Sequence, residues 1–396
     1  MSYCKIFLKP KKEESLLRFH PWVFSGAIAS IKGKPEEGDL VEVYGADHKL
    51  LGVGHYQIGS IAVRILSFQP AVIDKAFWAE KIRIAYELRR ALGLAEVADN
   101  NTCRLIHGEG DHLPGLVIDV YGTTAVIQAH SVGMHYARRV IAEALKEVSG
   151  NVLQNIYYKS EGSLPFKAEL GNENEYLLGR DTGEEHIAIE KNLYFYVDWI
   201  KGQKTGFYID QRENRLLLEQ YVSERTVLNM FCYTGGFSVY AMRGGARMVD
   251  SVDSSAKAIS LTQKNIELNF PGDPRHQTFA ADAFDYLGKM DDRYDLIILD
   301  PPAFAKHRNV IRNALLGYRK LNAIAFEKIK PGGIIFTFSC SQVVSKNDFR
   351  LAVFSAAAQS GRQVRILHQM TQPADHPVNI YHPEGEYLKG LVLEVR

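Results

Sequence analysis

A regular alternation of strand-like and helix-like segments occupies the C-terminal half of the chain, from about residue 190 onward. Short apolar runs, such as RTVLNMF at 225–231 and YDLIILD at 294–300, are typical of strands that are buried on both faces. Segments with apolar residues at three- and four-residue spacing lie between these runs, and parallel strands need such crossover helices. The alternation therefore predicts an α/β fold, a doubly wound sheet with a parallel core, over residues 191–396.

The first half of the chain has a different texture and predicts two further domains. Residues 1–73 carry the β-like runs DLVEVYG, LLGVGHY and SIAVRILSF, which are separated by glycines and indicate a small β-rich domain. Residues 74–190 contain two helical patterns on either side of an expected hairpin, and Asp74 is expected to cap the first helix. This mixture predicts a central α+β domain.

Composition narrows the class of protein. The 396 residues are 46% hydrophobic and have a formal net charge of +1, so a binding surface for nucleic acid would have to be local. No run approaches the roughly 18 apolar residues of a membrane helix, and no apolar signal segment opens the chain. The four cysteines are scattered without a CxxC pair. We therefore expect a cytoplasmic protein with reduced thiols, no membrane association and no structural zinc.

The strand ends of the predicted sheet carry the residues of interest, because ligands bind beyond the carboxyl ends of such strands. The first strand leads into NMFCYTGG, residues 229–236, whose two glycines let the backbone approach a ligand at the start of a helix. This segment is not the GxGxxG dinucleotide fingerprint. Asp253 ends the next strand, where a carboxylate can accept hydrogen bonds from ribose hydroxyls. A tight turn beside a surface acid is the alternative, and the position of Asp253 favours a nucleoside site.

Aspartates also end the third and fourth strands. Asp282 can hold an adenine amino group, although a helix N-cap is its more usual role and the two are compatible. Asp300 precedes Pro301 and Pro302, which have no N–H to donate and cannot continue a central strand. Phe304 follows this rigid corner and can stack on a planar ring. A purely structural strand end is the alternative, and the two prolines after a carboxylate favour a functional corner.

The fifth strand ends in Ser339-Cys340-Ser341. A free cysteine is usually a small buried hydrophobe, and that assignment would hold for a thiol in mid-strand. Cys340 instead ends its strand, and we expect it to face the same edge of the sheet as Asp300. The thiol is therefore a candidate nucleophile.

Two segments outside the sheet give weaker signals. Residues 201–215, KGQKTGFYIDQRENR, contain Lys204, Gln211 and Arg212, which can bind a carboxylate, but a hairpin with exposed charges explains the segment as well. Residues 107–115, HGEGDHLPG, look like a metal loop. Their glycines and proline favour a turn, and no third ligand cluster accompanies them, so no metal is expected.

These motifs resemble the bacterial 23S rRNA cytosine-5 methyltransferases of the large-subunit rRNA methyltransferase I family, over the whole chain. The motifs that carry the resemblance are RFHPWVFSGAI (18–28), RLIHGEGDHLPGLVIDVYG (104–122), KTGFYIDQR (204–212), NMFCYTGGFS (229–238), DPPAF (300–304), FSCS (338–341) and ADHPV…PEGEYLKG (374–390). The resemblance implies an RNA-binding PUA domain, a central α+β domain and a Rossmann-like, S-adenosylmethionine-dependent methyltransferase domain. It also implies ribosomal RNA of the large subunit as the partner.

The resemblance further implies roles for individual residues. Cys340 would be the nucleophile that adds to carbon 6 of the pyrimidine, and Asp300 would bind the cytosine edge. Asp253 would hold the ribose of S-adenosylmethionine. The other implied cofactor contacts are Lys204, Thr205, Phe207, Gln211, Phe231, Tyr233, Thr234, Gly235, Ser254, Asp282, Ala283 and Asp300 itself. The implied substrate contacts are Pro301, Phe304 and His376.

Several alternatives stay open. Some RNA cytosine-5 enzymes carry a second cysteine after the proline corner, where this chain has Ala303, so a uracil-5 enzyme also fits. Methylation of a purine nitrogen needs no nucleophile, and a ribosome-assembly protein with a vestigial domain needs no chemistry. Asp300, Asp375 and His376 are candidates for the base that removes the carbon-5 proton. The oligomeric state is open, with a homodimer as one option.

Overall fold

The computed structural model describes residues 3–164, 170, 174–305 and 307–396. The chain divides into two compact units, each made of segments that are not contiguous in the sequence. The first unit comprises Met1–Asn192, Val197–Ile209 and Ala374–Gly385. The second unit comprises Leu193–Tyr196, Asp210–Pro373 and Glu386–Arg396. The residues expected to form the β-rich and α+β domains thus both fall in the first unit.

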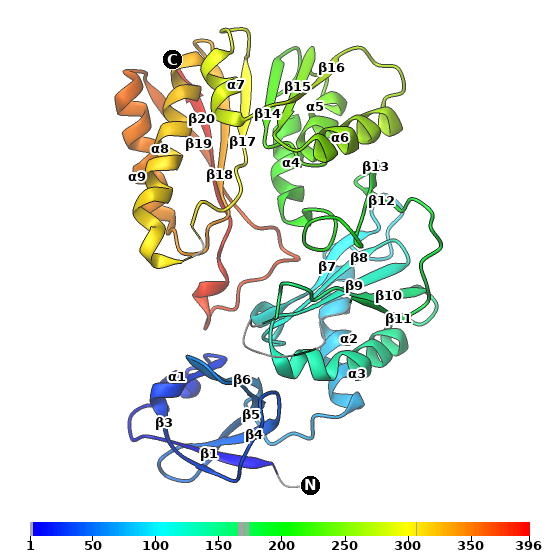
Figure 1. The fold of residues 1–396 in the computed structure, drawn as a ribbon, viewed down its shortest axis with the longest axis vertical. Coiled ribbons are helices and arrows are strands. Elements are labelled where there is room, and N and C mark those ends of the chain that lie inside the picture. Colours follow the sequence, from blue (N-terminus) through cyan, green and yellow to red (C-terminus); the bar gives the residue numbers. More distant parts are fainter. Residues whose placement is uncertain (1–2, 165–169, 171–173, 306) are drawn as a thin grey trace. The chain divides into compact units, whose positions relative to one another are not determined.

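The N-terminal part of the first unit is a six-stranded sheet with the strand order β2-β6-β5-β4-β1-β3 (Figure 1). Alternating apolar residues build its core, as Ile6 and Leu8 on β1 and Val41 and Val43 on β4 are all buried. The elements are β1 (Cys4–Leu8), α1 (Glu14–Leu17), β2 (Trp22–Phe24), β3 (Ile28–Lys32), β4 (Leu40–Tyr44), β5 (Leu50–Tyr56) and β6 (Ile61–Ser67).

The rest of the first unit contains a five-stranded sheet, in the order β11-β10-β9-β8-β7, and two long helices. Asp74 caps the first helix by accepting the Phe77 N–H at 3.0 Å, and the expected hairpin is the antiparallel pair β8–β9. Both predictions are confirmed. The elements are α2 (Lys75–Ala91), β7 (Thr102–His107), β8 (Leu116–Tyr121), β9 (Thr124–Ala129), α3 (Val132–Ser149), β10 (Asn155–Tyr158), β11 (Glu175–Leu178) and β12 (Ile187–Glu190).

The second unit is built on a seven-stranded sheet with the order β16-β15-β14-β17-β18-β20-β19. The first five strands of this order are parallel, and β20 runs antiparallel to both β18 and β19. The predicted doubly wound sheet with a parallel core is confirmed. Its strands are β14 (Thr226–Met230), β15 (Met248–Asp253), β16 (His276–Ala280), β17 (Leu296–Leu299), β18 (Gly333–Ser339), β19 (Val364–Thr371) and β20 (Lys389–Val395).

Helices cover both faces of this sheet, with α5 and α6 on one face and α8 and α9 on the other (Figure 1). Every residue of β14, β17 and β18 is buried, which explains why these strands read as unbroken apolar runs. The remaining elements of the unit are β13 (Leu193–Tyr196), α4 (Arg212–Glu219), α5 (Gly236–Arg243), α6 (Ala256–Asn269), α7 (Ala283–Lys289), α8 (Ile311–Lys328) and α9 (Lys346–Ser360).

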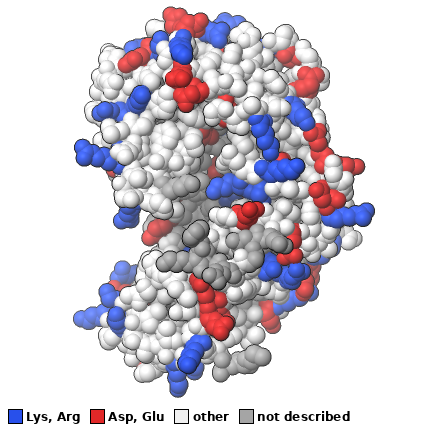
Figure 2. Space-filling model, viewed as in Figure 1, with Lys and Arg blue, Asp and Glu red and all other residues white. Residues whose placement is uncertain are grey.

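Lysine and arginine are interspersed with aspartate and glutamate over the face drawn in Figure 2, so the described atoms of that face form no broad surface of one charge. Among the described helices, none has the length and apolar character needed to cross a membrane.

Candidate active site

The parallel strands of the second unit bring the residues that follow them to one edge of the sheet. Met230 pairs with Val252 on one side and with Leu299 on the other, and Leu299 pairs with Thr337. The loop after β14, the end of β15 and the corners after β17 and β18 therefore lie along a single edge. Asp253 pairs with Ala280, so the residues that follow β16 also reach this edge. The predicted site residues that end or follow these strands are Phe231, Tyr233, Thr234, Gly235, Asp253, Ser254, Asp282, Ala283, Asp300, Pro301, Phe304 and Cys340.

The loop after β14 has an unusual backbone. Phe231, Tyr233 and Gly235 have φ angles of 59°, 46° and 76°, in the left-handed region that costs non-glycine residues free energy. A Cβ atom at Gly235 would lie 2.6 Å from Cγ2 of Thr262. The same threonine donates its hydroxyl to the Tyr233 carbonyl at 2.9 Å. Side chains of α6 thus hold a strained loop in place at the start of α5.

Asp253 links this loop to the next one. Its Oδ2 accepts the Tyr233 N–H at 3.0 Å, and its Oδ1 accepts the Ser255 N–H at 2.9 Å. A carboxylate offers about four acceptor positions, so both oxygens keep capacity for further donors. The geometry therefore allows Asp253 to accept hydroxyl groups of a ligand while it keeps its structural contacts.

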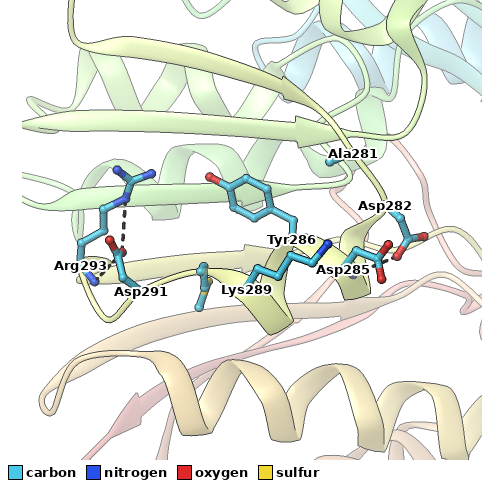
Figure 3. Close-up of a pocket in the computed structure, with 8 residues that line it drawn as sticks. Ala281, Asp282, Asp285, Tyr286, Lys289, Asp291 and Arg293 are labelled. Carbon is cyan, nitrogen blue, oxygen red and sulfur yellow. Dashed lines mark hydrogen bonds and ion pairs between the residues drawn. The ribbon is translucent and has the colours of Figure 1, made fainter.

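Asp282 is the N-cap of α7, because its Oδ1 accepts the backbone N–H groups of Phe284 and Asp285 at 2.9 and 3.1 Å. The expected capping role is confirmed. Asp282 also lines a cavity of about 510 Å³ that runs along α7 to Arg293 (Figure 3). Neither Asp300 nor Cys340 lines this cavity, so the cavity does not indicate where a substrate of the thiol would bind.

Asp300, in the corner after β17, has a raised pKa. Burial, reinforced by the negative charge of Asp210, raises the pKa of Asp300 to about 7. The Gln211 side-chain amide donates to Oδ2 of Asp300 at 3.0 Å, and Nδ2 of Asn214 donates to Oε1 of Gln211 at 2.6 Å. Asp300 is thus held in one orientation and can carry a proton near neutral pH.

Asp210 is a site residue that the sequence interpretation missed. Tyr387 donates its hydroxyl to Oδ2 of Asp210 at 2.6 Å. Oδ1 is buried and accepts no hydrogen bond from the described residues. A buried acceptor without a donor is costly, so it marks a position where a ligand group could donate. The only signal in the sequence is that Asp210 precedes Gln211 in the segment already singled out.

Cys340 follows β18 and is half-buried, with Sγ 3.9 Å from the Pro301 carbonyl oxygen. Burial raises the pKa of Cys340 to about 12, and the carboxylates of Asp300 and Asp210 act in the same direction, while Lys389 opposes them. The thiol is therefore protonated in the ligand-free protein at neutral pH. A nucleophilic role requires the thiolate.

The serines on either side of Cys340 have structural partners. The Ser339 hydroxyl donates to the Tyr318 hydroxyl at 2.9 Å, which also lies 3.0 Å from the Ser341 hydroxyl. Phe304 packs its ring against Tyr318 with 4.7 Å between the centroids. Helix α8 thus holds the corners after β17 and β18 through one tyrosine.

Lys389 is the second residue that the sequence interpretation missed. It opens β20 and is 5% exposed, and its Nζ donates to the carbonyls of Ser341 at 2.6 Å and Tyr387 at 2.8 Å. Burial lowers the pKa of Lys389 to about 8. The motif PEGEYLKG contains this lysine, but a lysine at the start of a strand is not distinctive by itself.

Four predicted site residues belong to the first unit, unlike Asp300 and Cys340: Lys204, Thr205, Phe207 and His376. Thr205 is buried and donates to Asp119 at 2.6 Å, and the Tyr121 hydroxyl donates to the Phe207 carbonyl at 3.2 Å. These contacts attach the segment to β8. Their role toward a ligand stays a prediction.

His376 lies in a buried polar network of the first unit. Its Nδ1 is 3.0 Å from Oδ1 of Asp375, whose Oδ2 accepts the Arg104 N–H at 3.0 Å. Arg89 donates to the Asp375 carbonyl at 2.8 Å and forms an ion pair with Asp111 at 2.5 Å. The residues around Asp111 form a turn, as expected for HGEGDHLPG. The predicted roles of Asp375 and His376 toward a substrate stay predictions.

Within the described ranges, one group of three side chains has the composition of a metal site: His20, His382 and Glu384. Nδ1 of His20 accepts the Trp22 N–H at 3.2 Å, so Nε2 carries the proton of the neutral ring. A metal-bound histidine normally donates from its free nitrogen instead. Glu384 lies 3.8 Å from Nε2 of both histidines. The protonation of His20 does not fit a metal ligand.

Comparisons with known proteins add independent information. The family model of a PUA-like domain matches residues 6–68, and that of an S-adenosylmethionine-dependent methyltransferase matches residues 160–382. The chain is 38% identical over 398 residues to the ribosomal RNA large subunit methyltransferase I of Aeromonas hydrophila, with 99% of each chain covered. It is 39% identical over 394 residues to the protein of that name in Tolumonas auensis, with 98% of each chain covered.

Solved structures show the same fold over the whole length. A chain from Streptococcus mutans, described as a candidate SAM-dependent methyltransferase, superposes with a TM-score of 0.84 at 23% identity. A second structure, a candidate methyltransferase complexed with SAH, superposes with a TM-score of 0.85 at 23% identity. Each comparison covers 100% of both chains.

Proposed function

We propose that this chain, which belongs to the ribosomal RNA large subunit methyltransferase I family, methylates carbon 5 of a cytosine in 23S ribosomal RNA. S-adenosylmethionine is the methyl donor of this family of enzymes, and the PUA-like domain fits an RNA substrate. The observation that carries the carbon-5 assignment is the thiol of Cys340, at the edge of the sheet where Asp300 also lies.

The thiol answers a chemical requirement. Carbon 5 of a pyrimidine is too poor in electrons to attack a methyl sulfonium directly. Addition of the Cys340 thiolate to carbon 6 breaks the C5–C6 π bond and makes carbon 5 nucleophilic. Carbon 5 then takes the methyl group, and S-adenosylhomocysteine leaves. A base removes the carbon-5 proton, the double bond re-forms, and the thiolate is expelled.

Asp300 favours cytosine over uracil in this scheme. Negative charge develops at N3 of the ring when the thiolate adds, and N3 of cytosine is an acceptor, whereas N3 of uracil carries a proton. A carboxyl group with a pKa of about 7 can donate a hydrogen bond to that acceptor. Gln211 already donates to Asp300, so we assign it to orienting this carboxyl group rather than to the cofactor. The target base must leave its stack to reach the thiol.

The cofactor assignment follows the strand order. Asp253 accepts the ribose hydroxyls, and Asp282 with Ala283 borders the adenine. The strained loop, with Phe231, Tyr233, Thr234 and Gly235, faces the sulfonium end, with Ser254 beside the ribose. Lys204, Thr205 and Phe207 bind the methionine end, and Pro301, Phe304 and His376 contact the RNA. This set is supported by the positions of the second-unit residues at one edge of the sheet.

A substitution of the nucleophile tests the proposal. We expect Cys340→Ala to lower methyl transfer to rRNA from a deletion strain by at least about a thousandfold. The affinity for S-adenosylmethionine, measured by calorimetry, should change less than about twofold. Cys4→Ala, which alters a half-buried cysteine of the first unit, is the matched control. Full activity of Cys340→Ala, with the methyl group mapped to a purine nitrogen by mass spectrometry, would overturn the covalent mechanism.

A further inference from the structure

We propose that Lys389 is the positioning residue that fixes the turn around Cys340 and supplies the positive charge opposite its thiolate. This inference rests on the proposed function, in which Cys340 is the nucleophile. It adds a role that neither the motif nor the family comparison assigns.

The contacts of Lys389 bracket the cysteine. In the antiparallel register of β18 and β20, Lys389 is the partner of Ser339. Its ammonium donates at 2.6 Å to the carbonyl of Ser341. Lys389 therefore holds the residue before Cys340 through strand pairing and the residue after it through its side chain. One lysine thus contacts the residues on both sides of Cys340.

The charge of Lys389 needs an explanation, because a buried ammonium is costly unless it is paired. Two of its three protons have carbonyl acceptors, Ser341 and Tyr387. Over the described part of the chain, no carboxylate forms an ion pair with it. Glu386 and the Cys340 thiolate favour its charged form, whereas burial and Lys346 oppose it. A thiolate is thus the anion that this buried cation lacks.

The surroundings of Cys340 show the complementary need. Asp300 and Asp210 disfavour the thiolate, and Lys389 is the cation that favours it. Without this lysine, two carboxyl groups would disfavour the thiolate and no cation would favour it. Each unit by which the pKa of the thiol rises lowers the thiolate fraction about tenfold below that pKa. The charge of Lys389 should therefore appear directly in the reactivity of Cys340.

A purely structural lysine would act only through its hydrogen bonds. Three substitutions separate the two roles: Lys389→Arg keeps charge and donors, Lys389→Gln keeps a donor without the charge, and Lys389→Met removes both. Lys330→Met is the matched control. Lys330 precedes the first residue of β18, whereas Cys340 follows the last, and Lys330 forms an ion pair with Asp295.

The experiment measures alkylation of Cys340 by iodoacetamide at pH 7, where Lys389 keeps its charge, in the full chain without RNA or cofactor, by mass spectrometry of the Cys340 peptide. We expect the rate constant to fall about tenfold in Lys389→Met and Lys389→Gln, and to stay within about threefold in Lys389→Arg. Lys330→Met should match the wild type. Cys4, alkylated in the same molecules, provides an internal reference.

A wild-type rate in Lys389→Gln would overturn the proposal, because that variant keeps a donor but has no charge. If Lys389→Met fails to fold, the comparison of Lys389→Gln with Lys389→Arg still decides. The assay contains no RNA, so a negative result here leaves the role of Cys340 in methyl transfer standing. If Cys340 is not the nucleophile, the Cys340→Ala variant will still transfer the methyl group, which is a separate measurement.

Discussion

Burial, Asp300 and Asp210 raise the pKa of the Cys340 thiol at the edge of the second-unit sheet, and Lys389 lowers it. Burial keeps Cys340 protonated in the ligand-free protein and gives Asp300 a pKa of about 7. Burial thus favours the neutral form of both groups. In the proposed reaction, Lys389 would stabilise the Cys340 thiolate, and Asp300 would donate a hydrogen bond to N3 of the cytosine.

The raised pKa of Asp300 predicts a pH-dependent stability. The folded protein binds the Asp300 proton more tightly than the unfolded chain does. The contribution to stability is therefore complete below about pH 4 and is lost as the pH rises through about 7. Relative to Asp300→Asn, we expect the wild type to lose about 4 kcal/mol between pH 4 and pH 8. Urea unfolding at a series of pH values checks this, and parallel curves for the two proteins would contradict it.

A side chain at Gly235 should clash with its surroundings, at a position where the backbone is already left-handed. Its Cβ would lie 2.6 Å from Thr262, whereas Gly361, with a similar φ of 68°, has nothing within 4 Å. We expect Gly235→Ala to lower the free energy of unfolding by about 3 kcal/mol and Gly361→Ala by about 1 kcal/mol. Equal losses in denaturant titrations would mean that the loop yields around the methyl group.

At the scale of elements, local patterns predicted much of the second unit. The apolar runs 225–231 and 294–300 contain β14 and β17, and Asp282 caps α7 as its position indicated. These features depend on neighbours in the sequence. The packing of α8 against two strand ends depends on residues that are far apart, so the link from Tyr318 to Ser339 and Ser341 was not predictable.

That link gives an element-level prediction. Tyr318→Phe removes the hydroxyl shared by Ser339 and Ser341 but keeps the ring that packs on Phe304. We expect a loss of about 1–2 kcal/mol in the free energy of unfolding, because two buried serine hydroxyls lose a partner. Tyr86→Phe, which breaks an exposed contact with Glu96 at 2.8 Å, should cost less than about 0.5 kcal/mol. A loss no larger than that of Tyr86→Phe would contradict the bridging role.

At the scale of the whole molecule, the division of the chain does not follow the order of the sequence. The segment Ala374–Gly385 lies between two strands of the second unit but belongs to the first. The resemblance implies that His376 contacts the substrate, and that role stays a prediction. Arg89 and Arg104, which lie 270 or more residues away in the sequence, donate hydrogen bonds to Asp375. Contacts between residues so far apart in the chain cannot be read from local patterns. For the same reason, Asp210 and Lys389 could not be assigned from local sequence.

The attachment of this segment is testable. Asp375 is fully buried and accepts the Arg104 N–H, so Asp375→Ala removes the carboxylate that contacts this donor and His376. We expect a loss of about 2–3 kcal/mol and faster amide exchange over residues 374–385. Asp47→Ala, at an exposed contact with Lys49, is the control and should change neither. Unchanged exchange in Asp375→Ala would show that other contacts hold the segment.

The central claim, covalent catalysis by Cys340, can be tested by trapping. An rRNA fragment with 5-fluorocytosine at the target position lacks the proton whose removal releases the enzyme, so methyl transfer should leave the base attached to the protein. We expect a stable adduct on the Cys340 peptide by mass spectrometry, dependent on S-adenosylmethionine and absent in Cys340→Ala. Turnover of the fluorinated RNA without an adduct, or an adduct on another residue, would contradict the account.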